Sequence, residues 1–141
     1  MSRLSPRLAA IVDALPLWPG MRVLEIGGAP GAAAREVARR IGDGHILVID
    51  RSATGVAQIE RNASSQIAYG RLSVRHCAAE VFDLLPNEAP FNLVFAIRVG
   101  AFDGRHPEVG EVARQRVAAA LAPGGRFFID GGDLLREITL G

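Results

Sequence analysis

The sequence alternates between short apolar runs and segments with helical periodicity, and this alternation constrains the fold more than any other feature. Five runs are candidates for strands, at residues 22–26, 45–50, 72–77, 91–97 and 126–130. Most of them lack the polar–apolar alternation of a half-exposed strand, which predicts a parallel sheet covered on both faces. The run at 72–77 (LSVRHC) is less apolar, so we expect it at an edge of the sheet.

The segments between the runs carry apolar residues at helical spacing. In 32–41 (AAAREVARRI), Val37 and Ile41 stand four residues apart, and Glu36 is spaced to pair with Arg40. Similar spacing marks the start of the chain, the stretch after Ser52 and the segment at about 107–121. Strands that alternate with helices form an open α/β sheet with right-handed crossovers. We predict one domain over the whole chain, with strand order 3-2-1-4-5.

Composition excludes several kinds of chemistry. The 141 residues carry a formal net charge of +1, which gives no clear signal for nucleic acid as a partner. Lysine is absent, so mechanisms that need a Schiff base or a P-loop lysine are excluded. Cys77 is the single cysteine and the three histidines are scattered, so we predict no metal site. No apolar run is long enough to span a membrane, and we expect a cytoplasmic protein.

A glycine-rich turn after the first run is the strongest candidate for a ligand site. The stretch VLEIGGAPG (23–31) leads from a strand through Gly27, Gly28 and Gly31 into a helix. In sheets of this order, ligands bind at the carboxyl ends of the strands where the order reverses. Asp50 ends the second run about 20 residues after Gly31, where a carboxylate can accept both ribose hydroxyls. Each feature alone could simply shape the backbone, but together they predict ligand binding.

The spacing of the glycines distinguishes two kinds of ligand. A dinucleotide fingerprint places glycine at its first, third and sixth positions. From Gly27 onward, the third and sixth positions hold Ala29 and Ala32. The missing middle glycine is where a pyrophosphate comes closest, so the spacing argues against NAD. The pattern E-x-G-x-G-x-G fits better, with one glycine replaced by alanine, through Glu25, Gly27, Ala29 and Gly31.

The glycine turn, together with VIDRS (48–52), FNLVFAIRV (91–99) and LAPGGRFFID (121–130), resembles the class I S-adenosylmethionine-dependent methyltransferases. The resemblance extends from about Leu8 to Asp130, with the four motifs in the order of the family. It implies a three-layer Rossmann-like sandwich with a mostly parallel sheet, which binds S-adenosylmethionine. The cofactor-binding residues that it implies are Glu25, Gly27, Gly28, Ala29, Gly31, Asp50, Arg51, Ala79, Glu80, Ala96 and Arg98.

The resemblance also implies a role for each group of residues. Residues 25–31 would line the methionine part of the cofactor, and Asp50 would hold the ribose hydroxyls with Arg51 beside the adenine. Ala79 and Glu80 would border the adenine ring, and residues 96–98 would form the floor near the sulfonium. Arg98 is unusual there, because it brings a long cation close to a positively charged sulfur.

Several departures from the family pattern affect the expectations. Ala29 replaces a common glycine, Asn92 a common acidic residue in the fourth run, and Ala78 stands where an aspartate is frequent. The sequence also ends soon after the fifth run, whereas family members usually continue into an antiparallel hairpin. We therefore expect the C-terminal hairpin to be missing, the edge of the fifth strand to be open, and a homodimer to be a way of covering it.

Methyl transfer depends mainly on placing the nucleophile, the methyl group and the sulfur in line, although a base helps with a hydroxyl or a protonated amine. His106 and Asp103, in the loop after the fourth run, are the candidate catalytic residues. The alternative is that DGRHPE (103–108) only forms a turn and a helix start. His76 and Cys77 are interpreted as structural residues.

We predict a methyltransferase that acts on a small-molecule acceptor. One alternative is a catalytically silent module that binds S-adenosylmethionine or S-adenosylhomocysteine without turnover. Another is an NAD-binding oxidoreductase domain, which the glycine spacing disfavours.

Overall fold

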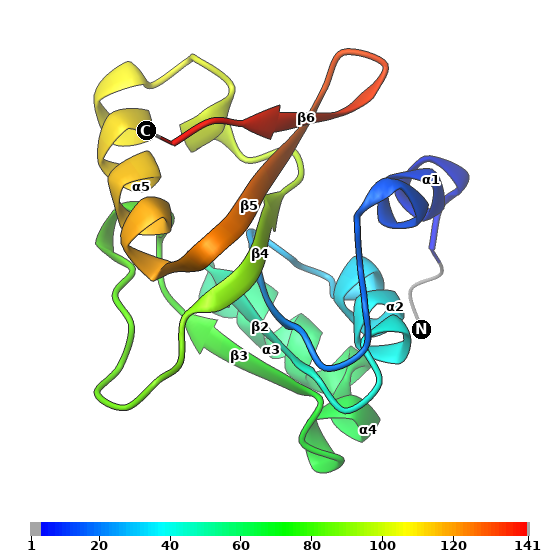
Figure 1. Cartoon of the computed structure of the whole chain (residues 1–141). Coiled ribbons are helices and arrows are strands. Elements are labelled where there is room, and N and C mark those ends of the chain that lie inside the picture. Colours follow the sequence, from blue (N-terminus) through cyan, green and yellow to red (C-terminus); the bar gives the residue numbers. More distant parts are fainter. Residues whose placement is uncertain (1–3, 141) are drawn as a thin grey trace.

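A six-stranded sheet forms the centre of the molecule (Figure 1), in a computed structural model that describes residues 4–140. The strands are β1 (Arg22–Ile26), β2 (His45–Asp50), β3 (Leu72–His76), β4 (Phe91–Ala96), β5 (Leu121–Gly131) and β6 (Leu134–Ile138). Their order in the sheet is β3-β2-β1-β4-β5-β6. The first five strands are parallel and follow the predicted order, with β3 at one edge.

The helices are α1 (Pro6–Ala14), α2 (Ala32–Arg40), α3 (Ala53–Asn62), α4 (Ser64–Ala68) and α5 (Pro107–Ala120), with two short 3₁₀ turns, η1 (Ala79–Val81) and η2 (Gly100–Phe102). Serine side chains begin two of them. The hydroxyl of Ser5 accepts the N–H of Leu8 at 3.2 Å before α1, and that of Ser52 accepts the N–H of Gly55 at 3.1 Å before α3. Within residues 4–140, no helix combines the length and apolarity needed to cross a membrane.

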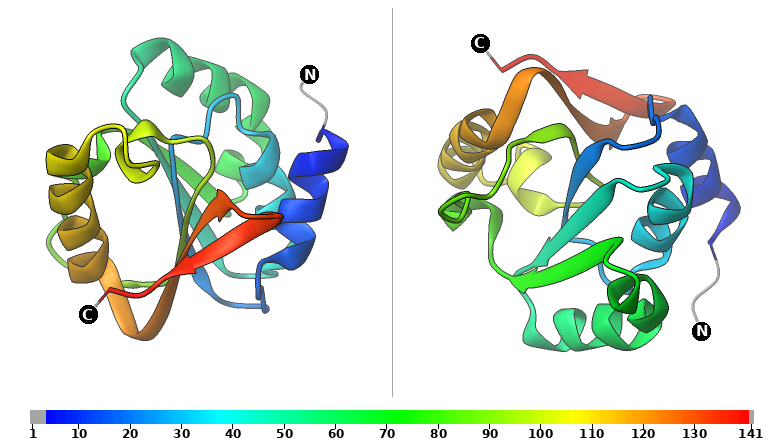
Figure 2. Two further views of the ribbon diagram at one scale, coloured as in Figure 1. Left: turned by 90° about the horizontal axis from the view of Figure 1, so that it is seen from above. Right: turned by 60° about the horizontal axis from the view of Figure 1, so that its bottom comes forward.

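Different helices cover the two faces of the sheet. Val23 and Leu24 are neighbours in β1, and their side chains belong to two separate apolar clusters. The cluster of Val23 includes residues of α1, α2 and α3, whereas that of Leu24 includes residues of α5, η1 and η2. Figure 2 shows α5 on one side of the sheet and α1 and α2 on the other. This three-layer Rossmann-like arrangement confirms that the apolar runs are covered on both faces.

The prediction that the C-terminal hairpin is missing is wrong. β5 turns through Gly132 and Asp133 and returns as β6, which pairs with it antiparallel. A two-residue Gly-Asp turn between two apolar stretches is a hairpin signal that the prediction did not use. β5 also begins five residues earlier than predicted, with an irregular register against β4 between Phe91 and Leu93.

The hairpin covers the strand edge on which the homodimer prediction was based. Because β6 pairs with β5 from Phe127 to Gly131, the open β5 edge that motivated the homodimer does not exist. An ion pair between Arg126 and Glu137, with 2.8 Å between nitrogen and oxygen, links the same two strands. The homodimer stays a prediction, now without that support.

The strand order reverses between β1 and β4, and this reversal positions the site. Glu25 of β1 lies opposite Val48 of β2 on one side and Phe95 of β4 on the other. β2 and β4 lead away from β1 into crossovers on opposite faces of the sheet. The loops that follow the three strands therefore diverge and leave a crevice at the carboxyl ends.

Candidate functional site

The glycine turn has a backbone shape that requires glycine at two positions. Gly27 has a φ of 71° and Gly31 a φ of 105°, both in the left-handed region that glycine adopts without strain. The N–H of Gly27 donates to the carbonyl of Ile49 at 2.8 Å, which ties the turn to the end of β2. The peptide bond between Ala29 and Pro30 is cis. The fold itself therefore explains Gly27 and Gly31, before any ligand is considered.

Gly28 is needed for a different reason, which is packing. A Cβ atom at this position would lie 2.4 Å from Cγ1 of Val48 and 2.8 Å from the carboxyl carbon of Glu25. Its missing side chain thus makes room for the Glu25 carboxyl group under the turn. The sequence interpretation, in which the glycines admit a ligand, missed this internal role.

Asp50 supports the glycine turn and the start of α3. Its Oδ2 accepts the N–H of Ala29 at 3.1 Å, and its Oδ1 accepts the N–H of Ser52 at 2.9 Å. The side chain is buried, and a Cβ at Gly55 would lie 2.9 Å from Oδ1. Each carboxylate oxygen keeps a further lone pair, which the predicted bonds to ribose hydroxyls would use.

Glu25 is the most unusual group of the site. Its residue is only 3% exposed, and no described residue donates a hydrogen bond to its Oε1. Burial, with a smaller contribution from the charge of Asp50, raises the pKa of Glu25 to about 8. The carboxyl group is therefore largely protonated at neutral pH. A buried carboxyl oxygen without a donor marks a position that a ligand can complete.

A cavity of about 500 Å³ lies at the carboxyl ends of the strands, and we call it the glycine-turn cavity. Residues from the loops after β1, β2, β3 and β4 line it, together with Val109 in the first turn of α5. The predicted site residues among them are Gly27, Arg51, Ala79, Glu80, Arg98 and His106. The topology thus brings together residues from four separate loops.

A second cavity of about 430 Å³, the hairpin cavity, is built around β4, η2 and the β5–β6 turn. It shares Arg98, Val99 and Arg105 with the glycine-turn cavity, so the two adjoin. The predicted residues Ala96 and Asp103 line it. The remaining predicted residues, Glu25, Gly28, Ala29, Gly31 and Asp50, line neither cavity. The cofactor contacts of all these residues stay predictions.

The two candidate catalytic residues differ in their surroundings. The carboxylate of Asp103 accepts the Arg105 N–H at 3.0 Å and pairs with its guanidinium at 2.7 Å. These contacts, the backbone bond first, hold the pKa of Asp103 below its usual range, which makes it a poor base. His106 is exposed, precedes the first residue of α5 and lines the glycine-turn cavity. It is the better placed of the two.

Sequence reasoning missed Asp130 and Arg136, which both line the hairpin cavity. Asp130 ends the fifth apolar run of the sequence (126–130) as Asp50 ends the second, so the rule that identified Asp50 could also have found it. Arg136 lies on β6, which was not predicted. Its place in the site could not have been found without the hairpin.

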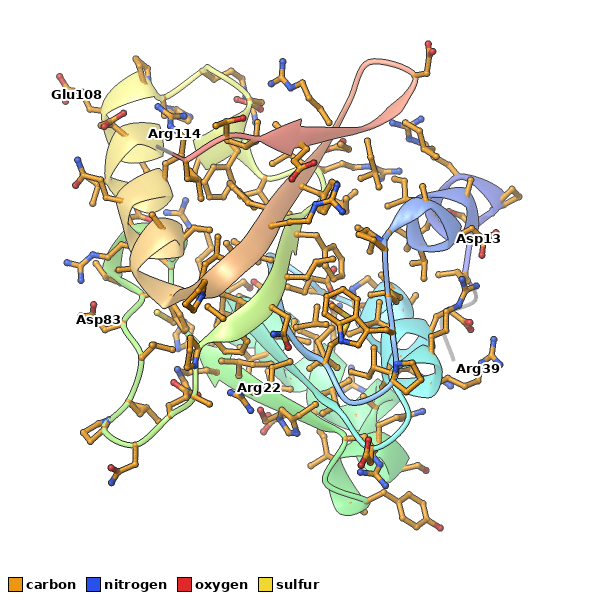
Figure 3. All side chains as sticks on the ribbon, viewed as in Figure 1. Asp13, Arg22, Arg39, Asp83, Glu108 and Arg114 are labelled. Carbon is orange, nitrogen blue, oxygen red and sulfur yellow. The ribbon has the colours of Figure 1, made fainter. Side chains whose placement is uncertain are left out.

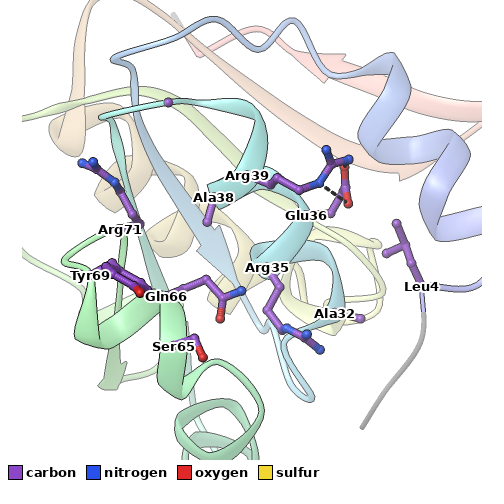
Figure 4. A pocket seen from close by; sticks show the side chains of 11 residues that line it. Leu4, Ala32, Arg35, Glu36, Ala38, Arg39, Ser65, Gln66, Tyr69 and Arg71 are labelled. Carbon is purple, nitrogen blue, oxygen red and sulfur yellow. Dashed lines mark hydrogen bonds and ion pairs between the residues drawn. The ribbon is translucent and has the colours of Figure 1, made fainter.

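A third cavity, of about 600 Å³, lies on the outer side of α2 and α4 (Figure 4). Arg35, Arg39 and Tyr69 are among its lining residues, and Arg39 pairs with Glu36. None of the loops that follow the strands contributes to it. We therefore place the candidate site at the other two cavities. Among the described residues, no group of three histidine, cysteine or acidic side chains is arranged to hold a metal ion.

Comparison with known proteins agrees with this geometry. Residues 23–125 match the model of a family described as "Methyltransferase domain". The matched range includes the glycine turn, Asp50, the loop after β4 and α5. No curated protein sequence matches the chain.

Several solved structures share the fold. YJHP from E. coli is 26% identical over 87% of this chain and 47% of its own, with a TM-score of 0.65. An S-adenosylmethionine-dependent methyltransferase from Geobacter sulfurreducens, solved with S-adenosyl-L-homocysteine, is 24% identical over 89% and 48%, with a TM-score of 0.67. The [4+2]-cyclase SpnF is 22% identical over 86% and 42%, with a TM-score of 0.68. The chain spans about half the length of these structures.

Proposed function

The chain belongs to the methyltransferase domain family, because the family match covers most of it, and on that premise we propose that it is an S-adenosylmethionine-dependent methyltransferase with a small-molecule acceptor. The observation that carries the proposal is Oε1 of Glu25, which is buried beneath the glycine turn and has no hydrogen-bond donor among the described residues. The Geobacter sulfurreducens relative was solved with S-adenosyl-L-homocysteine, which supports the same cofactor here. The net charge of +1 favours a small molecule over nucleic acid.

The residues present fit such a cofactor. Glu25 offers an unused acceptor to an ammonium group, and Asp50 keeps lone pairs for two hydroxyls. The glycine-turn cavity, at about 500 Å³, lies within the range of small-molecule sites. Arg51, Ala79 and Glu80 would surround the adenine, as the motifs imply.

When bound, S-adenosylmethionine supplies a methyl group on a positively charged sulfur, which a nucleophile on the acceptor takes as the carbon–sulfur bond breaks. The protein's part is to hold both molecules in line and to exclude water. The loop after β4 is placed for this, because Val99 comes within 2.8 Å of where a Cβ of Gly27 would be. We assign His106 as the base that accepts a proton from the acceptor, when the acceptor carries one.

A second candidate function is a silent cofactor-binding module. It is favoured by Asp103, whose carboxylate is occupied by Arg105 and so does not serve as a base. The likeness to a [4+2]-cyclase also illustrates that this fold serves chemistry other than methyl transfer. Binding of S-adenosylhomocysteine without any release of it from S-adenosylmethionine across an acceptor panel would favour this candidate.

Calorimetric titration of S-adenosylhomocysteine and NAD into the purified protein tests the cofactor. We expect S-adenosylhomocysteine to bind and Asp50→Ala to weaken its binding at least about 100-fold, as expected for two lost hydrogen bonds to a charged group. Asp50→Asn keeps one carbonyl acceptor and guards against a misfolded alanine variant. Asp43→Ala, before β2 at the opposite end of the sheet, is the matched control. Binding of NAD alone, or an unchanged affinity in both Asp50 variants, would reject the proposal.

A further inference from the structure

We infer that the methyl acceptor is a small organic anion, a carboxylate or a phosphate ester, whose charged group is held by Arg98 and Arg136 in the hairpin cavity. The inference rests on the proposed function, because it assigns the hairpin cavity to the acceptor and the adjoining glycine-turn cavity to the cofactor. The two cavities share Arg98, so a group held there lies beside both molecules.

The backbone of Arg98 is the first observation. Its φ is 57°, a left-handed conformation that is uncommon for a residue with a side chain. The N–H of Arg98 donates to Oδ1 of Asp130 at 2.9 Å, which holds this conformation at the end of β4. Strained residues that a neighbouring group maintains are concentrated at functional sites. Arg98, in this conformation, lines both cavities.

The charges around the hairpin cavity are the second observation. Three guanidinium groups and two carboxylates line it: Arg98, Arg105, Arg136, Asp103 and Asp130. Asp103 and Arg105 neutralise each other in an ion pair of 2.7 Å. Within residues 4–140, neither Arg98 nor Arg136 forms an ion pair. Two uncompensated cations therefore face a single carboxylate.

A sulfonium in the neighbouring cavity would add another positive charge. A neutral or cationic acceptor would leave these like charges close together, whereas an anion compensates them. Guanidinium groups are suited to this task, because their planar donors match the oxygens of a carboxylate or phosphate. A cation beside a positively charged sulfonium is difficult to explain from the cofactor alone. Binding of an anionic acceptor gives Arg98 a role.

The remaining walls of the hairpin cavity suit a small acid with an apolar body. Phe102 and Ile129 are buried, and they add apolar surface to a cavity whose other lining residues are mostly charged or small. Its volume of about 430 Å³ is sufficient for a single aromatic ring with a charged substituent. Gly131 also lines it, and a Cβ there would lie 3.9 Å from Nε of Arg136, so the guanidinium lies beside the β5–β6 turn.

Calorimetry with three probe ligands tests the inference. Benzoate, phenyl phosphate and the neutral benzamide are titrated into the protein, with and without saturating S-adenosylhomocysteine. We expect at least one anion to bind about tenfold more tightly than benzamide, as one extra charge-assisted hydrogen bond provides. The two anions distinguish a carboxylate acceptor from a phosphate ester. Arg136→Gln should reduce this preference to about twofold and leave the dissociation constant of S-adenosylhomocysteine unchanged.

The control is Arg61→Gln, which removes the same charge from an exposed position on α3 that lines neither cavity. It should keep the full preference for the anion. Arg136 is itself exposed, so its replacement is not expected to prevent folding.

The possible outcomes separate the two proposals. If S-adenosylhomocysteine binds but benzamide binds as tightly as both anions, the acceptor inference is rejected and the proposed function is not. An equal loss of the preference for anions in Arg61→Gln and Arg136→Gln would also reject the inference. The overall positive charge of the protein, and not Arg136 itself, would then explain the result. If S-adenosylhomocysteine does not bind to the wild-type protein, the proposed function fails, and the acceptor role fails with it.

Discussion

Polar groups at the two ends of the sheet differ in their hydrogen-bond partners. Arg22 lies at the amino end (Figure 3). Its N–H donates to Oδ1 of Asn92 at 2.7 Å, and its guanidinium lies 4.9 Å from the centre of the Phe91 ring. At the carboxyl end, Oε1 of Glu25 has no donor among the described residues, and Arg98 holds a left-handed backbone. The backbone N–H of Arg22 is thus satisfied at the amino end, whereas Glu25 keeps an unused acceptor at the end where a ligand is expected.

The largest expected effect concerns Glu25 at the carboxyl end. Its pKa is raised from 4.5 to about 8 in the folded protein, so folding takes up a proton between these pH values. The contribution of the protonated group is fully present below pH 4.5 and is lost as the pH rises through 8. Wild-type stability should therefore fall, relative to Glu25→Gln, by on the order of 4 kcal/mol between pH 5 and 8.

Urea unfolding of both proteins at pH 5, 6, 7 and 8 measures this difference. Parallel stability profiles would show that Glu25 does not titrate as its burial indicates.

The protonation of Glu25 should also affect the affinity for the cofactor. The ammonium group of the cofactor favours the ionised carboxyl, so its binding releases a proton from Glu25. The affinity for S-adenosylhomocysteine should rise from pH 6 to 8 in the wild type, and this rise should be absent in Glu25→Gln.

Gly28→Ala should have the next largest effect. The added Cβ would lie 2.4 Å from Val48 and would displace the Glu25 carboxyl group, so we expect a loss of about 2–3 kcal/mol in the free energy of unfolding. Gly131→Ala is a matched control, since the nearest atom to its Cβ would be 3.8 Å away. Equal stabilities of the two variants, measured by urea unfolding, would contradict the packing role of Gly28.

Asn92→Ala tests the amino end. It leaves the N–H of Arg22 without its acceptor, which should cost about 1 kcal/mol of stability. Because this bond lies at the opposite end of β1 from the glycine turn, the affinity for S-adenosylhomocysteine should not change. A parallel loss of cofactor affinity in calorimetry would break the distinction between the two ends.

The smallest effect is expected for Glu137→Gln. The Arg126–Glu137 ion pair joins β5 to β6, but both side chains are more than two-fifths exposed. Its removal should cost less than about 1 kcal/mol, and the cost should shrink in high salt. A loss of several kcal/mol would mean that the hairpin depends on this one pair instead of its backbone bonds.

The sequence predicted the fold best where a pattern is local. β1 and β2 have the predicted bounds, because each is a short, mainly apolar run between turn residues. The prediction failed at β6, whose residues are half-buried or exposed and whose only local signal is the Gly132–Asp133 turn. An edge strand that buries little apolar surface has a weak sequence signature, and pairing with β5 decides its structure.

The candidate site shows the same contrast between what local patterns predict and what tertiary contacts decide. Motif spacing alone predicted that Gly27, Asp50 and the loop after β4 lie close together, since parallel strands bring their carboxyl ends to one edge. In the structure, Gly27 and the loop after β4 line the glycine-turn cavity, whereas Asp50 lies outside it and bonds to the glycine turn. Only the tertiary structure decided that Gly28 makes room for Glu25, that Asp50 holds the glycine turn, and that Asp130 holds the backbone of Arg98. These contacts join residues from different strands and loops. Their distances depend on packing, which spacing along the chain does not record.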